Sequence, residues 1–183
     1  MAYAIALSTL GWALAGFALA MLIPALVAFG YGESDQAWTF LVSAGITLFA
    51  GGSLVIATRG TPRQPSQREA FALAVLVWLI LPVFGALPLF YIGVVPTVTD
   101  AYFEAMSGLT TTGATVLTEL HIIERSVLVW RALLQWLGGL ATLMLTVVLL
   151  SFYSVGAMKL FRSAMPRGER HDLRVQLVQS LRA

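Results

Sequence analysis

A run of threonines closed by a glycine is the clearest candidate for chemistry in this chain. The stretch consists of Thr111, Thr112, Gly113, Ala114 and Thr115. Backbone carbonyls presented on one side of an extended segment can replace the water around a cation, as the carbonyl rings of K⁺ filters do. Gly113 permits backbone angles that other residues resist, and threonine hydroxyls can add oxygen ligands. The stretch therefore predicts a cation-binding segment; a threonine-rich turn between helices is the alternative.

A short helix just before this stretch would position it. Thr99 or Asp100 can cap the helix, and Glu104 follows near its first turns, where acids suit the positive end of the helix dipole. We expect the helix to stop near Leu109 or Thr110. Its negative end would then face the threonine–glycine stretch, in a membrane interior where a cation is otherwise poorly solvated.

The composition indicates that a membrane is the solvent of this chain. Of its 183 residues, 58% are hydrophobic and only 11% are charged, and the mean hydropathy is +0.84. Soluble domains carry about 25% charged residues. The chain has no cysteine, which excludes disulfides, thiol nucleophiles and cysteine-ligated metals. The net charge of +2 does not indicate nucleic-acid binding.

Four stretches are long and apolar enough to cross a bilayer, which takes roughly 20 residues. They are residues 4–29, 38–57, 70–92 and 127–153. The first is too long for a cleaved leader and is predicted to be a retained span. Pro24 and Pro82 fall inside two of the spans, where proline is tolerated and marks a kink.

The basic and acidic residues are unevenly distributed among the connectors and the tail. Nine of the eleven basic residues lie in the connector after the second stretch and in the tail, whereas most acids lie in the other connectors. Because basic residues favour the cytoplasmic side, both termini are predicted to be cytoplasmic.

The third stretch would then end outside, and the fourth would begin outside. Residues 101–117, between them, are too short and too polar to span. A segment that enters and leaves by the same face satisfies both facts, provided that protein or water shields its backbone. The predicted fold class is an all-α polytopic membrane protein with four transmembrane helices, one re-entrant pore helix and a filter strand.

The sequence DAYFEAMSGLTTTGATVL, followed by WRALLQWLGG, resembles the first pore loop and following helix of the Trk/Ktr/HKT superfamily of potassium transporters. It is most similar to the TrkH-type branch. Weaker similarities cover the rest of the chain, in MLIPALVAFGYGE, REAFALAVLVW and GAMKLFRSAMP. The resemblance implies K⁺ transport without enzymatic activity or a cofactor, with K⁺ bound at the carbonyls of Thr111 and Thr112 and with Gly113 as the filter glycine.

The resemblance also implies a division of the chain and a set of partners. Residues 1–69 would hold two leading helices and a cytoplasmic loop, residues 70–158 the first membrane–pore–membrane repeat, and residues 159–183 a basic cytoplasmic linker. Family members have four such repeats, form dimers and, in this branch, dock on a cytoplasmic nucleotide-binding regulatory subunit of the TrkA type. Membrane lipids complete the expected partners.

One pore loop cannot encircle an ion. We expect the chain to be a truncated form whose further repeats lie elsewhere; assembly of four copies or supply by separate chains are the other possibilities. A non-conducting membrane protein that associates with other transporter subunits is the alternative function.

Several residues near the motif carry two interpretations each. Arg131 either snorkels to headgroups or pairs with Glu104 or another acid to brace the pore loop, with Asp100 as a further support. Gly138 and Gly139 predict close helix packing, or a bend below the filter.

The tryptophans are predicted to line the membrane interfaces; they are Trp12, Trp38, Trp78, Trp130 and Trp136. Two pairs, His121 with Glu124 and His171 with Asp172, are predicted to be solvated rather than metal-binding.

Overall fold

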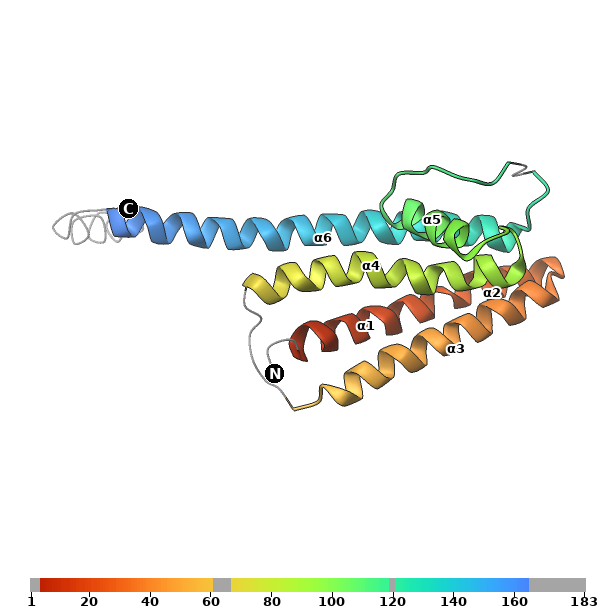
Figure 1. The fold of residues 1–183 in the computed structure, drawn as a ribbon, viewed down its shortest axis with the longest axis horizontal. Helices are drawn as coiled ribbons and strands as arrows, with labels where there is room; N and C mark the ends of the chain where they lie inside the picture. The colour runs from red at the N-terminus through yellow and green to blue at the C-terminus, as the bar shows by residue number, and fades with distance from the viewer. Residues whose placement is uncertain (1–3, 61–66, 119–120, 165–183) are drawn as a thin grey trace, which may run out of the picture. The chain divides into compact units, whose positions relative to one another are not determined.

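The computed structural model describes residues 4–60, 67–118 and 121–164 (Figure 1). It divides into two units, Met1–Thr142 and Leu143–Ala183, of which the second is described only as the continuation of one helix to Ala164. The middle of the expected cytoplasmic loop and most of the expected linker, with His171 and Asp172, lie outside the described residues.

Six helices account for the regular structure of the described residues, which include no β-strand. They are α1 (Ala4–Ala20), α2 (Leu22–Tyr31), α3 (Ser34–Ala57), α4 (Gln67–Ile92), α5 (Val98–Leu109) and α6 (Arg125–Ala164). Four stretches are long and apolar enough to cross a membrane: Ala6–Tyr31, Ser34–Ala57, Phe71–Ile92 and Arg125–Val147. The all-helical fold is thus confirmed for the described residues, with four helical stretches that could span a membrane.

The first span is broken into α1 and α2 at Met21. Pro24 explains the break, because it has no N–H to donate to the carbonyl one turn earlier and its ring crowds that carbonyl. The chain continues in the same direction, with Met21 N–H bonded to the Phe17 carbonyl at 3.2 Å. Pro82, by contrast, lies within a continuous α4.

The core of the first unit is built around one tryptophan. Trp130 of α6 is fully buried, and its ring centroid lies 5.2 Å from that of Phe17 in α1 and 6.1 Å from that of Phe40 in α3. Its indole N–H donates to the Gly85 carbonyl of α4 at 3.0 Å. Trp130 therefore faces the protein core, where a buried acceptor satisfies its indole N–H.

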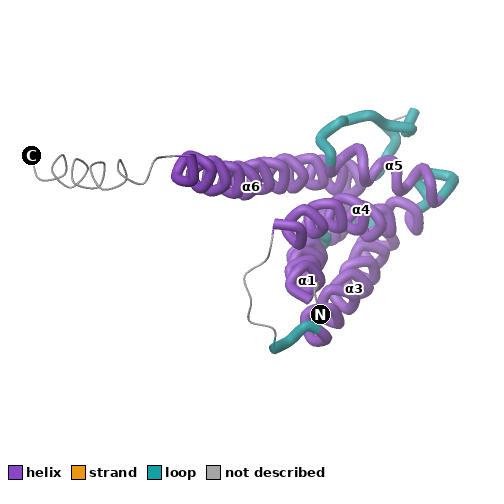
Figure 2. Tube along the Cα trace, turned by 60° about the vertical axis from the view of Figure 1, so that its left-hand side comes forward, coloured by secondary structure: helices purple, strands orange, loops and turns teal. Residues whose placement is uncertain are grey.

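Close contacts between small residues hold the leading helices together. A Cβ on Gly11 of α1 would lie 2.8 Å from the Gly51 carbonyl oxygen of α3, and one on Gly51 would lie 2.7 Å from the Gly11 oxygen. Such pairs let helix backbones approach closely in lipid. Both views show α1, α3 and α4 together, with α5 beside α4 (Figures 1 and 2).

Candidate functional site

The short helix α5 begins earlier than its sequence suggested. Its cap is Thr97, whose hydroxyl oxygen accepts from the Asp100 N–H at 3.1 Å, while the hydroxyl donates to the Asp100 carboxylate at 2.6 Å. The structure therefore corrects the expected caps, Thr99 and Asp100. Asp100 instead supports the start of α5 from its first turn, where a carboxylate also favours the positive end of the helix dipole.

The other end of α5 lies against the middle of the α6 span. A Cβ on Gly138 would overlap the Leu109 carbonyl group, whose carbon would be 2.6 Å away, and one on Gly108 would lie 2.8 Å from the Leu134 Cβ. Gly138 follows Arg125, the first residue of α6, by thirteen positions, which is about 20 Å along a helix. The contact at Gly138 is close packing, one of its two predicted roles.

After Leu109 the chain turns sharply rather than forming a β-strand. Thr111 has φ 56° and Gly113 has φ 74°, both in the left-handed region. The N–H groups of Thr111 and Thr112 donate to the carbonyls of Gly108 and Ser107, at 2.9 and 3.0 Å. The segment thus satisfies its backbone donors on the end of α5, in the manner of a helix C-cap, and it pairs with no strand in the part of the chain that the structure describes.

The carbonyls of this turn remain available. Within the described residues, no hydrogen bond reaches the carbonyl oxygens of Thr111, Thr112 or Gly113. The same residues are exposed in this chain, and the hydroxyl oxygens of Thr110 and Thr112 lie 2.8 Å apart beside them. The turn therefore presents consecutive oxygen ligands of the kind that suits a dehydrated cation.

The segment that follows Gly113 returns along α5. The Ser107 hydroxyl donates to the Ala114 carbonyl at 2.6 Å, and one turn earlier the Glu104 carboxylate accepts from both the Thr115 hydroxyl and the Val116 N–H, each at 2.6 Å. Because the contacts of successive residues move toward the start of α5, the two segments form a hairpin of helix and loop. We call residues 110–117 the return segment.

Glu104 connects the return segment to α6. Its side chain is buried, with Oε1 occupied by the return segment and Oε2 3.0 Å from the Nε of Arg131. No aligned hydrogen bond reaches Oε2 from the described residues, so the contact with Arg131 is an ion pair. The structure thus brings together Glu104, Arg131 and Thr115, whereas Asp100 lies at the far end of α5.

Two residues at this site were missed in the sequence. Ser107 follows Glu104 by three positions, which places both on one face of α5, and that spacing could have identified it. Gln135 of α6 lies beside Gly113, with its Nε2 3.5 Å from where a Cβ on the glycine would be. Gln135 is polar within an apolar span, which is the usual sign of a functional position.

Among the described residues, no three His, Cys, Asp or Glu side chains lie close enough together to hold a metal ion. His121 and Glu124 belong to the connector before α6, and the Glu124 carboxylate accepts from the Gln36 amide at 3.0 Å.

Known proteins resemble this chain over most of its length. Residues 39–182 match the TrkH family, described as a cation transport protein. The chain is 39% identical over 162 residues to the Trk system potassium uptake protein TrkH of Halomonas elongata, covering 87% of this chain and 33% of the relative. It is 34% identical over 157 residues to TrkG of Escherichia coli K12, covering 85% and 32%.

A solved structure is similar as well. The crystal structure of the potassium transporter TrkH from Vibrio parahaemolyticus aligns with a TM-score of 0.78 at 32% identity, over 97% of this chain and 37% of that one. The chain therefore spans about a third of the length of the curated relatives it matches.

Proposed function

Because this chain belongs to the TrkH family of cation transport proteins, we propose that it contributes one pore loop to a pathway that carries K⁺ across a bacterial inner membrane. The carbonyls of Thr111 and Thr112 would bind the ion, with Gly113, Ala114 and Thr115 completing this part of the filter. The observation that carries the proposal is a turn whose carbonyls accept no hydrogen bond from the described residues, at the end of a helix that stops beside the middle of an apolar stretch long enough to span.

The contacts of α5 support a re-entrant path. The helix has 12 residues, about 18 Å, against a hydrocarbon core of about 30 Å, so it cannot cross. From the end of α4 the helix runs back beside α4 as far as Gly138 of α6, and the return segment leads back toward the start of α6 (Figure 1). Its negative dipole end would then favour a cation at membrane depth.

Glu104 and Arg131 would hold this loop in shape. The carboxylate fixes two groups of the return segment with short hydrogen bonds, and the guanidinium balances its charge from α6. A charge buried in a span is tolerated when it is paired in this way. In this arrangement neither group would bind K⁺ itself; both would set where the neighbouring carbonyls lie.

The remaining walls of the pathway would come from other pore loops. Four loops around one ion would supply the ring of carbonyls that selectivity requires, either from further repeats or from copies of this chain. The family resemblance adds a cytoplasmic regulatory subunit as a partner. Its contact would be the basic stretch 159–183, most of which lies outside the described residues.

A pair of glycine substitutions tests the proposal. Gly113 and Gly93 are both exposed, with φ 74° and 83°, so alanine strains each backbone similarly, by about 1–2 kcal/mol. We expect Gly113→Ala to abolish most K⁺ uptake, since it distorts the carbonyl turn, and Gly93→Ala to leave most of it. Uptake is measured as growth of a K⁺-uptake-deficient strain on low K⁺, with the chain expressed from its native coding region.

The outcomes separate the candidate functions. Equal uptake by both variants would contradict the filter role of Gly113. Absence of uptake by the wild type, together with its co-purification with other transporter subunits, would support the alternative of a non-conducting membrane partner.

A further inference from the structure

The turn between α2 and α3 is fixed to the beginning of α6. Glu33, at this turn, accepts from the Arg125 N–H at 2.9 Å with one carboxylate oxygen and from the Ser126 N–H at 3.2 Å with the other. These N–H groups have no partner within α6, because they belong to its first turn. A carboxylate there makes charge-assisted hydrogen bonds and meets the positive end of the helix dipole.

Two further contacts surround Glu33. The Gln36 amide donates to the Glu124 carboxylate at 3.0 Å, and the Arg125 guanidinium lies 4.4 Å above the Tyr31 ring, within the range of a cation–π contact. Residues on both sides of the α2–α3 turn therefore contact the residues that begin α6. We call Tyr31, Glu33 and Gln36 the turn clamp.

The clamp lies close to the groups that hold the return segment. Arg131 follows Arg125 by six residues, less than two helical turns, and pairs with Glu104, which in turn fixes Thr115 and Val116. Between the two arginines, Trp130 is packed against Phe17 and Phe40 of the leading helices. The clamp and the tryptophan thus both fix the turns of α6 that carry Arg131.

We infer that Glu33 is a positioning residue for the pore loop: the leading helices hold the start of α6 through its carboxylate and so fix where Arg131 places Glu104 and the return segment. The ion-selectivity part of this inference rests on the proposed K⁺ pathway; the structural part does not. If Glu33 served only as a helix cap, its removal would change protein stability but not the geometry of residues 110–117.

A cysteine probe reports that geometry without any transport measurement. The chain has no natural cysteine, so Val116→Cys, at a side chain 43% exposed, gives a single site for a membrane-impermeant maleimide. In this background, Glu33→Ala should speed labelling about fivefold, the equilibrium equivalent of losing one helix cap. Glu33→Asp, which keeps a carboxylate, should recover most of the slow rate.

A matched control removes the same charge from the adjacent first turn of α3. Asp35 is exposed two residues beyond Glu33, and Asp35→Ala should leave the labelling rate unchanged. If Glu33→Ala does not accumulate in the membrane, Gln36→Leu, which removes only the bond to Glu124, should give a smaller increase. Unchanged labelling in whichever variant accumulates, or an equal increase in Asp35→Ala, would overturn the inference.

Uptake by the same variants, without the probe, completes the test. Glu33→Ala should lower the preference for K⁺ over Na⁺ about fivefold at unchanged protein in the membrane, and Glu33→Asp should restore it. Normal preference with faster labelling would overturn the link to selectivity. If the wild type shows no uptake while labelling still responds to Glu33, the proposed function fails and the positioning role stands.

Discussion

Glu104 has three polar partners on a side chain that is 1% exposed. Removing one partner of a buried ion pair leaves the other charge uncompensated, at a cost of about 3–5 kcal/mol. We therefore expect Arg131→Gln to lower both the melting temperature of the detergent-purified protein and K⁺ uptake. Arg131→Lys keeps the charge and should retain more of each, although it loses the planar guanidinium.

The difference between Arg131→Gln and Arg131→Lys tests whether the charge of Arg131 is needed. Thermal unfolding in detergent measures stability, and uptake on low K⁺ measures function. Normal stability and uptake in both variants would show that Arg131 only anchors the helix to lipid headgroups. Such a result would remove Arg131 as a brace for the pore loop.

At the residue scale, the sequence predicts some of this site and not the rest. An acidic and a basic residue near the same motif predict the pairing of Glu104 with Arg131, because a charged side chain inside a membrane needs a partner. Glu33 has no such signal: the groups it binds are backbone N–H groups 92 and 93 positions later. Backbone donors carry no residue identity, so only the fold reveals the contact.

Among the elements, α5 and α6 meet where α6 has two consecutive glycines. Gly138 faces the Leu109 carbonyl group with no room for a Cβ, whereas the nearest atom to a Cβ on Gly139 would be the Thr111 Cγ2 at 3.8 Å. We expect Gly138→Ala to destabilise the protein by about 1–3 kcal/mol, as overpacking does, and to reduce uptake. Gly139→Ala is the matched control and should change little.

Fluorescence-detected size exclusion after heating gives the stability of both variants, and growth on low K⁺ gives their uptake. Equal tolerance of the two alanines would mean that the end of α5 does not press on Gly138 in the protein. The carbonyl turn would then need another support at that depth.

Element identity was easier to predict than element detail. Long apolar runs predict the four spans because the bilayer fixes the required length, and the threonine run with its glycine predicts the end of α5. The cap at Thr97 and the burial of Trp130 depend on neighbours far along the chain, such as the Gly85 carbonyl. Such features are therefore set by tertiary packing and cannot be predicted from the local sequence pattern alone.

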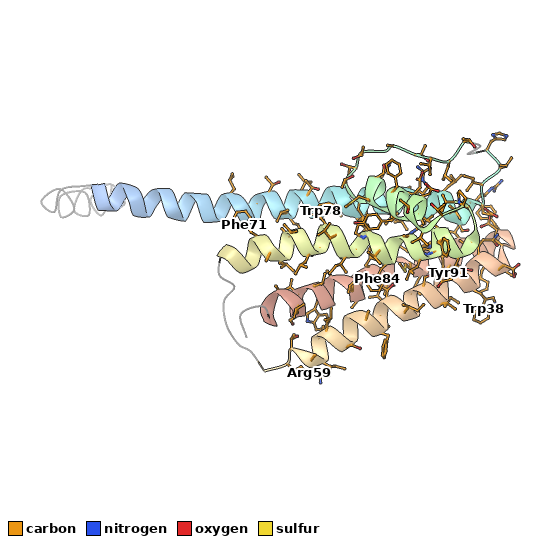
Figure 3. The ribbon with its side chains drawn as sticks, viewed as in Figure 1. Trp38, Arg59, Phe71, Trp78, Phe84 and Tyr91 are labelled. Carbon is orange, nitrogen blue, oxygen red and sulfur yellow. The ribbon has the colours of Figure 1, made fainter. Side chains whose placement is uncertain are left out.

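In the first unit, the two ends of the helices differ in the residues that they carry and in their charge. Arg59 and Phe71 lie toward one end, and Trp38 and Tyr91 lie toward the other (Figure 3). Glu33 shares the second end with Arg125, to which it is hydrogen-bonded. An acidic clamp end and a basic loop end fit the expected orientation, with the clamp outside and Arg59 in the cytoplasm.

Single cysteines test this orientation, because the chain has none of its own. In intact spheroplasts, an impermeant maleimide should label Ser34→Cys at the clamp end and Ile122→Cys in the connector before α6, both at exposed positions. Arg59→Cys should react only after permeabilisation; it removes one of many basic residues on its side, so the orientation is kept. Labelling of Ile122→Cys only after permeabilisation, together with Arg59→Cys, would place the connector before α6 in the cytoplasm. The pore loop could not then open outward, and its carbonyl turn could not meet external K⁺.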